Sequence, residues 1–113
     1  MLVFVYGTLK QGFCNHYYLA GAEYLGLYRT CESYGLYDFG NYPAVALDGE
    51  QAIGGEVFRI SNEHLTALDV LEGYPDFYQR IKIETDYGQA WMYVVSEQLC
   101  SGKSKLSDDW NNS

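Results

Sequence analysis

Basic side chains are scarce in this sequence. Seven Lys and Arg residues stand against 15 Asp and Glu residues in a chain of 113, so the formal net charge is -8. A chain with this charge repels the phosphate backbone of nucleic acids, and we therefore expect no nucleic-acid partner. Long hydrophobic runs are also missing, since no stretch approaches the roughly 20 apolar residues that a membrane-spanning helix needs. We expect no membrane association.

Cysteine and histidine are few and scattered. The three thiols, Cys14, Cys31 and Cys100, have no paired spacing, which favours reduced cysteines in a cytoplasmic protein. The two histidines, His16 and His64, are too isolated to suggest a metal site or a catalytic triad. The sequence therefore predicts no metal site, and no feature near Cys14 marks it as an activated nucleophile.

Apolar and aromatic residues are plentiful. Hydrophobic residues make up 48% of the chain and aromatic residues 17%, including 12 tyrosines. This composition can form the core of a single domain over residues 1–113, in which residues 96–113 are a polar C-terminal tail. Short segments rich in valine and aromatic residues, separated by glycines, predict strands at 2–6, 24–30, 33–38, 44–47, 55–60, 78–85 and 89–95.

One main helix is expected over residues 62–71. Ser61 and Asn62 are good N-caps, three leucines follow at helical spacing, and Gly73 and Pro75 end the pattern.

The combination of many short strands with one strong helix predicts an α+β fold. We expect a small mixed β-barrel with one main helix and one or two short helices packed around it, the first short one over residues 15–20. Small barrels often bind ligands at the mouth, and tyrosine suits a partly wet pocket because it joins apolar area to a polar tip.

Glu72 departs from the pattern of the predicted helix. At about 100° per residue it projects between Leu65 and Leu68, toward the core, and it lies in the last turn, where the helix dipole disfavours a carboxylate. Both effects oppose ionisation, so we expect a raised pKa, which a general acid/base near neutral pH requires. The alternative is a structural acid that reaches water or pairs with Arg80 or Lys82.

The residues Tyr6-Gly7-Thr8-Leu9 stand where the first predicted strand runs into a loop. A glycine at such a place lets successive backbone N–H groups converge on an anion, and Thr8 adds a hydroxyl donor. Because the overall charge is negative, an anionic substrate must be bound by local donors of this kind. The alternative is an ordinary turn between a strand and a loop.

Tyr78 and Arg80 lie on the polar face of the strand that follows Glu72. We expect Tyr78 to donate a hydrogen bond in the pocket and Arg80 to order the loop by contacting Glu72 or neighbouring carbonyls. A solvated strand face is the alternative. Tyr42, with Pro43 after it, is expected at the pocket rim or in a turn.

Taken together, these motifs resemble the γ-glutamylcyclotransferase-like family, in particular its small γ-glutamylamine cyclotransferase branch. The similar blocks follow one another along almost the whole chain: residues 6–10 with Gly12, Asn15 and Leu19, then 42–44, 55–57, and 68–75 continued by Tyr78 and Arg80. The family's catalytic glutamate falls at Glu72. The ending Asp108-Asp109-Trp110 differs from the Gly-Asp-Trp that is common in the family.

The resemblance implies an enzyme that uses neither a metal nor an organic cofactor. Its substrate would be a γ-glutamyl amine or γ-glutamyl amino acid, whose α-amine attacks its own γ-carbonyl to give 5-oxoproline and a free amine. Glu72 would act as the general base and then as the acid. The residues expected to bind the substrate are Tyr6, Gly7, Thr8, Leu9, Tyr42, Tyr78 and Arg80.

Two other functions fit the same residues. One is a non-catalytic module of the same fold that binds a small ligand or a partner, and the other is a γ-glutamyl amidase that uses water and releases glutamate. The sequence favours no particular oligomeric state.

Overall fold

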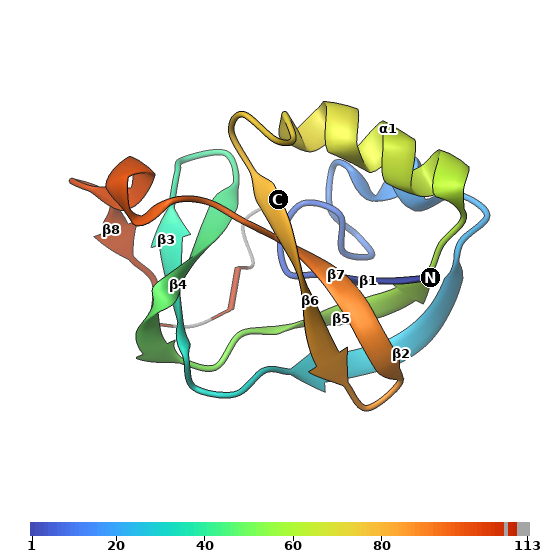
Figure 1. The fold of residues 1–113 in the computed structure, drawn as a ribbon, viewed down its shortest axis with the longest axis horizontal. Coiled ribbons are helices and arrows are strands. Elements are labelled where there is room, and N and C mark those ends of the chain that lie inside the picture. The colour runs from blue at the N-terminus through green and yellow to red at the C-terminus, as the bar shows by residue number, and fades with distance from the viewer. Residues whose placement is uncertain (108, 111–113) are drawn as a thin grey trace.

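Eight strands, one α-helix and two short 3-10 helices make up the computed structural model, which describes residues 1–107, 109 and 110 (Figure 1). In chain order they are β1 (Leu2–Val5), η1 (His16–Leu19), β2 (Glu23–Arg29), β3 (Tyr34–Asp38), β4 (Pro43–Gln51), β5 (Gly54–Arg59), α1 (Asn62–Glu72), β6 (Gln79–Thr85), β7 (Gly88–Val94), η2 (Glu97–Cys100) and β8 (Ser104–Lys105). In this described part of the chain, no helix is long and apolar enough to cross a membrane.

The strands form two sheets, and the fold is of the α+β class. The larger sheet has the order β2-β5-β1-β7-β6 and the smaller one β4-β3-β8. Strand β1 pairs antiparallel with β5 and parallel with β7. The two sheets meet beyond the end of β7, where the Val95 N–H donates to the Val45 carbonyl at 2.9 Å.

The predicted barrel is not confirmed, because the described strands do not close into one ring. The outer strands of the larger sheet are β2 and β6, and no strand ladder joins them. They approach through a side chain instead: Tyr87, in the turn between β6 and β7, donates its hydroxyl hydrogen to the Leu27 carbonyl of β2 at 3.2 Å. The larger sheet therefore curls without closing.

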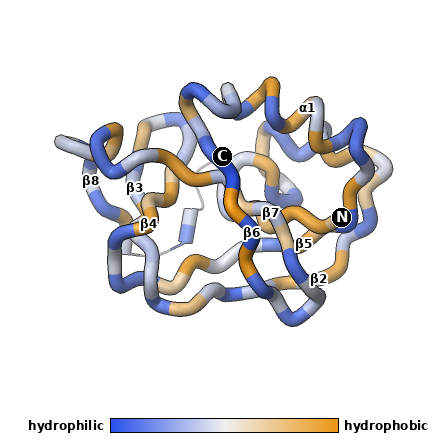
Figure 2. The backbone as a smooth tube through the Cα atoms, viewed as in Figure 1, coloured by the Kyte–Doolittle hydropathy of each residue, from blue (hydrophilic) through white to orange (hydrophobic). Residues whose placement is uncertain are grey.

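Strand β1 is covered on both faces, which explains its continuous apolar sequence. Val3 and Val5 pack in a core cluster that includes Leu68 of α1, whereas Leu2 and Phe4 pack in a second cluster on the other face. Figure 2 shows hydrophobic stretches in the central strands and hydrophilic ones in the turns.

Helix α1 has the predicted start and ends one residue later than predicted. The Ser61 hydroxyl accepts a hydrogen bond from the His64 N–H, and His64 Nδ1 accepts one from the Ser61 N–H. This is a capping box in which a histidine replaces the usual Glu or Gln. Gly73 ends the helix in the left-handed conformation (φ 68°, ψ 35°), which glycine adopts without strain. Glu72 is therefore the last residue of α1.

The tail packs back against the body of the protein more closely than its polar composition suggests. Strand β8 pairs with β3, and Trp110 is buried. The Trp110 carbonyl accepts a hydrogen bond from Lys10 Nζ at 2.6 Å, and Asp109 pairs with Arg29 at 2.7 Å. Position 108, where the sequence differs from the family pattern, lies outside the described residues, as do residues 111–113.

Candidate functional site

A cavity of about 340 Å³ opens beside the C-terminal end of α1, and its size is typical of small-molecule sites. Residues from six segments line it: Phe4, Val5, Tyr6, Gly7, Thr8, Leu9, Cys14, Asn15, Asn41, Tyr42, Pro43, Leu71, Glu72, Phe77, Tyr78 and Tyr93. The cavity thus brings together seven of the eight site residues expected from the sequence, and the eighth, Arg80, does not line it.

Glu72 presents a half-buried carboxyl group to this cavity. Burial raises the pKa of Glu72 from its ordinary value of 4.5 to about 7, which confirms the direction expected from the sequence. Within the described residues no group donates a hydrogen bond to the carboxyl, and the alternative ion pair with Arg80 or Lys82 is not formed. A carboxyl with this pKa can accept and return a proton near neutral pH.

Three tyrosines surround Glu72, and each directs its hydroxyl hydrogen elsewhere. The Tyr6 hydroxyl donates to the Tyr93 carbonyl at 2.7 Å. The Tyr78 hydroxyl donates to the Pro43 carbonyl at 2.7 Å, and the Tyr93 hydroxyl donates to Asp69 at 2.7 Å. Burial is the main cause that raises the pKa of all three tyrosines, and the nearby Glu72 carboxylate adds to it. Glu72 is therefore desolvated by aromatic rings without receiving a hydrogen bond from them.

The roles expected for two of these tyrosines change accordingly. The Tyr6 hydroxyl also accepts the Val45 N–H at 3.2 Å, so it joins the two sheets and forms part of the cavity floor. The Tyr78 hydroxyl has already donated its hydrogen to Pro43. It can accept a hydrogen bond from a ligand but cannot donate one while the Pro43 bond is kept.

The turn after β1 differs from the Glu72 side of the cavity. Glu72 is an acceptor that receives no hydrogen bond from the described residues, whereas the turn carries N–H donors that find no acceptor among them. Among the described residues, the backbone N–H groups of Gly7, Thr8 and Leu9 donate to no protein acceptor. The Thr8 hydroxyl accepts a hydrogen bond from Asn15 Nδ2 at 2.9 Å, and the Asn15 N–H donates to the Thr8 carbonyl at 2.9 Å. Asn15 therefore fixes the turn and leaves the hydroxyl hydrogen of Thr8 available to a ligand.

Pro43 connects the turn to the Glu72 side of the cavity. A Cβ atom at Gly7 would lie 2.7 Å and 2.8 Å from the ring carbons Cγ and Cδ of Pro43, closer than such atoms can approach. Only glycine fits there without moving the proline, whose carbonyl in turn holds Tyr78.

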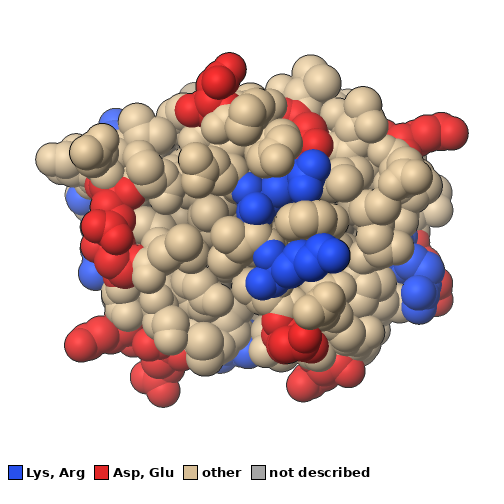
Figure 3. All heavy atoms as spheres, in the orientation of Figure 1, with Lys and Arg blue, Asp and Glu red and all other residues tan. Residues whose placement is uncertain are grey.

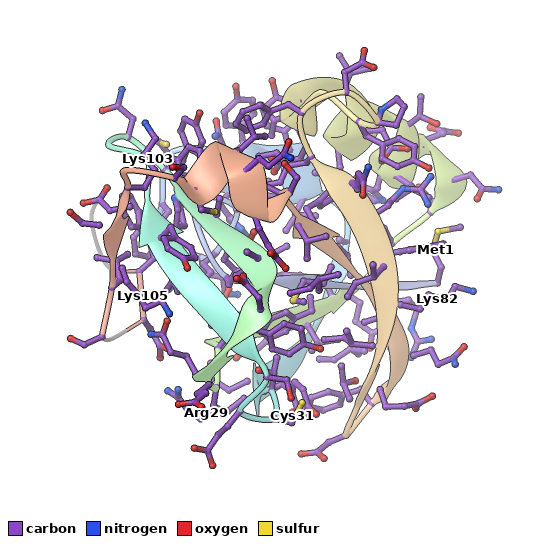
Figure 4. All side chains as sticks on the ribbon, turned by 60° about the vertical axis from the view of Figure 1, so that its left-hand side comes forward. Met1, Arg29, Cys31, Lys82, Lys103 and Lys105 are labelled. Atoms are coloured by element: carbon purple, nitrogen blue, oxygen red, sulfur yellow. The ribbon has the colours of Figure 1, made fainter. Side chains whose placement is uncertain are left out.

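The rim of the cavity is aromatic. Tyr42 is 37% exposed and packs against Phe39 and Phe77, with ring centroids 5.7 Å and 6.3 Å away. No Lys or Arg side chain is among the described lining residues. Lys82 extends outward from β6, Lys103 precedes β8 and Lys105 lies in it (Figure 4). Lys103 Nζ is 5.0 Å from the ring centroid of Phe39, outside the lining residues.

Arg80 lies behind the cavity, where its guanidinium group pairs with Asp69 at 2.9 Å. The sequence suggested Glu72 or neighbouring carbonyls as its partner. The two acids are three residues apart on α1, but Asp69 faces β6 and takes the arginine, which leaves Glu72 to the cavity.

Sequence reasoning missed Tyr93 and the role of Asp69. Tyr93 comes from β7, and only the parallel pairing of β1 with β7 brings it to the cavity, so no local signal reveals it. For Asp69 the sequence did hold a signal, because it lies one helical turn before Glu72 and could compete with it for Arg80. In the described part of the chain, no three His, Cys, Asp or Glu side chains gather in a group that could hold a metal ion.

Comparison with known proteins gives one consistent family. The sequence profile described as gamma-glutamyl cyclotransferase, AIG2-like, matches residues 3–112. A Vibrio cholerae protein named "Putative gamma-glutamylcyclotransferase" is 46% identical over 109 residues, which cover 96% of this chain and 94% of that protein. The Escherichia coli gamma-glutamylcyclotransferase family protein YtfP is 39% identical over 97% of this chain and 96% of its own.

Solved structures agree with the sequence matches. The solution structure of Escherichia coli YtfP superimposes with a TM-score of 0.76 at 38% identity and covers 97% of this chain and 95% of its own. A mouse AIG2-like protein gives a TM-score of 0.76 at 28% identity over 83% of this chain and 76% of its own. The chain belongs to the gamma-glutamyl cyclotransferase, AIG2-like family.

Proposed function

We propose that this protein is a γ-glutamylcyclotransferase, which converts a γ-glutamyl amine or γ-glutamyl amino acid to 5-oxoproline and a free amine. The observation that carries the proposal is the Glu72 carboxyl, whose pKa is about 7. It lines the same cavity as a turn whose N–H groups donate to no acceptor within the described residues. The family to which the chain belongs supports the same activity. Three free cysteines fit a reducing, cytoplasmic setting.

The turn of Gly7, Thr8 and Leu9 would hold the glutamyl head group. Its N–H groups and the Thr8 hydroxyl can donate to the α-carboxylate or to the developing oxyanion, which suits an acidic protein that cannot attract an anion by its overall charge. The Tyr78 hydroxyl can accept a hydrogen bond from the substrate's α-ammonium group. These contacts would fold the substrate so that its α-nitrogen lies against its own γ-carbonyl.

Glu72 would carry the proton through the reaction. As a carboxylate it takes a proton from the α-ammonium, and the freed amine attacks the γ-carbonyl carbon to form the new C–N bond of the lactam. Glu72 gives this proton to the leaving nitrogen as the tetrahedral intermediate collapses and the original amide C–N bond breaks. It then takes the second surplus proton from the new ring nitrogen and passes it to the free amine, which leaves as an ammonium ion. No proton is gained or lost overall, so one residue with a pKa near neutrality is sufficient.

The aromatic rim favours leaving groups without a carboxylate. Because the described lining residues include no Lys or Arg, the carboxylate of a leaving amino acid would find no cationic partner among them. We therefore expect γ-glutamyl-isoamylamine to be a better substrate than γ-glutamyl-leucine, which differs from it by one carboxylate.

The test is a mass-spectrometric assay of 5-oxoproline, glutamate and the free amine after incubation with a panel of γ-glutamyl amines and amino acids. Glu72→Gln should abolish product formation. Glu63→Gln, the same substitution at an exposed position in the first turn of the same helix, is the matched control and should retain activity.

The products also distinguish the two other functions. Release of 5-oxoproline with the amine supports the proposal, whereas glutamate with the amine would identify an amidase that uses water. If the folded protein binds a γ-glutamyl head group and releases neither product, the proposal is wrong and the chain is a binding module.

A further inference from the structure

A half-buried ion pair lies directly behind Glu72. Arg80 Nε donates to Asp69 Oδ1 at 2.9 Å and Arg80 Nη2 donates to Asp69 Oδ2 at 3.1 Å. The side chains are 16% and 19% exposed, respectively. Asp69 is one helical turn before Glu72 on α1, so the two acids lie on neighbouring positions of one face. The pair therefore joins the last turn of α1 to strand β6.

Two aromatic rings enclose the guanidinium group of Arg80. Its Cζ atom lies 4.3 Å from the ring centroid of Tyr74 and 4.4 Å from that of Trp91 on β7. Tyr74 follows Glu72 by two residues, and its N–H donates to the Asp69 carbonyl at 2.9 Å. The pair thus holds the chain on both sides of Glu72. Figure 3 shows basic side chains over β6 in the middle of this face, with acidic side chains next to them.

Asp69 also accepts the hydroxyl hydrogen of Tyr93 at 2.7 Å. The Tyr93 ring lines the cavity beside Glu72. Because Asp69 takes this hydrogen, Tyr93 does not offer it to Glu72. Although burial acts to raise it, the hydrogen bonds from Arg80 and Tyr93 lower the pKa of Asp69, so this acid stays ionised and remains an acceptor.

We infer that Asp69 and Arg80 form a positioning pair, which fixes Glu72 toward the cavity and keeps hydrogen-bond donors away from its carboxyl. Arg80 on this assignment does not bind substrate. The inference rests on the proposed role of Glu72, but it concerns two residues that do not touch the substrate.

The groups that face Glu72 from neighbouring elements are otherwise uncharged. They are the hydroxyls of Tyr6 directly after β1, Tyr78 before β6 and Tyr93 from β7, with the Cys100 thiol of η2 near Tyr6 and Tyr78, and the Cys14 thiol on the cavity wall. An intact pair of Asp69 with Arg80 adds no net charge. Loss of either partner leaves a single charge one helical turn from Glu72.

The two halves of the pair should therefore affect Glu72 in opposite directions. In Asp69→Asn, the unpaired Arg80 cation stabilises the carboxylate, so the pKa of Glu72 falls. In Arg80→Met, the unpaired Asp69 carboxylate disfavours a second negative charge, so the pKa rises. Each change should be about 0.5 or more, and the double variant should return close to the original value.

Carbon-13 NMR titration of the Glu72 side-chain carboxyl measures these values without any turnover. A purely structural role for the pair predicts a different result: the turn would open, water would reach Glu72, and its pKa would fall in both single variants. A fall in both, or no change in either, overturns the inference.

The kinetic readout tests positioning directly. In the 5-oxoproline assay, each single variant should lower kcat about tenfold while KM stays within about twofold, and Arg80→Lys should recover part of kcat because it keeps the charge. Unchanged kcat in both variants would also overturn the inference. The control is Arg59→Met, which breaks the exposed ion pair with Glu23 away from the cavity and should leave kcat and the Glu72 pKa unchanged.

The proposed function can fail separately. If the unmodified protein forms no 5-oxoproline, the function is wrong, while the NMR titration still decides whether the pair controls Glu72.

Discussion

Two walls of the cavity differ in what they lack. The turn of Gly7, Thr8 and Leu9, the donor wall, carries N–H groups that donate to no acceptor within the described residues. The end of α1, the acid wall, carries the Glu72 carboxyl, which receives no hydrogen bond from the described residues and whose ionisation is disfavoured by burial. Buried polar groups normally find partners within the protein. Here the N–H groups of the donor wall and the Glu72 carboxyl of the acid wall form no hydrogen bond with each other among the described contacts.

The difference shows how the protein maintains a reactive site. The three tyrosine hydroxyls around Glu72 could donate to its carboxyl, but each has another acceptor. The carbonyls of Pro43 and Tyr93 and the carboxylate of Asp69 accept the three hydrogens. A γ-glutamyl substrate has an anionic head group for the donor wall and an ammonium for the acid wall. It can therefore complete both sets of hydrogen bonds at once.

The largest expected effect is on stability and follows from the acid wall. The pKa of Glu72 is about 7 in the folded protein against an ordinary 4.5. Between these pH values the folded state binds more protons than the unfolded state, so stability falls as pH rises through that window. Glu72→Gln mimics the protonated acid. It should be more stable than the unmodified protein at about pH 8, by up to about 3 kcal/mol.

Urea denaturation of both proteins at several pH values measures this difference, and other titrating groups cancel between them. The gain should shrink toward zero below about pH 4.5, where the carboxyl is protonated in both states. A difference that does not change with pH would mean that Glu72 is not held in its protonated form.

The next largest effect should come from Gly7→Ala, which disturbs the donor wall. The new Cβ would lie 2.7 Å from the Pro43 ring, so the proline and the Tyr78 hydroxyl that it holds must shift. A displacement of this size should lower kcat/KM about 100-fold. Adding Pro43→Ala removes the clashing ring carbons and should restore part of the activity. Full activity in Gly7→Ala alone would show that the contact has no bearing on the site.

Much of this arrangement could be predicted from local sequence. The cap at Ser61, the three leucines and Gly73 define α1 because helix ends are set by neighbouring residues. Glu72 could be identified because an acidic side chain on the apolar face of a helix is unfavourable unless it has a function or a partner. The turn at Gly7 was recognisable because a glycine follows a buried strand directly.

What local sequence could not predict depends on long-range pairing. Tyr93 reaches the cavity through the pairing of β7 with β1, and Arg80 finds Asp69 because β6 passes that side of α1. The expectation of a barrel failed for a similar reason. Short strands predict a curled sheet, but closure depends on whether β2 and β6 pair, and among the described residues Tyr87 bridges them by a side-chain hydrogen bond in place of a strand ladder.

The smallest of these effects should follow from Thr8→Val, which removes one donor and keeps the shape of the side chain. Since Asn15 donates to the Thr8 hydroxyl, the hydroxyl hydrogen is free to bind the substrate, and its loss should lower kcat/KM about tenfold, mostly through KM. Thr8→Ser keeps the hydroxyl and is the matched control. If the valine and serine variants are equally active, the backbone N–H groups alone form the donor wall. If kcat falls while KM is unchanged, the hydroxyl acts on the transition state instead of the bound head group.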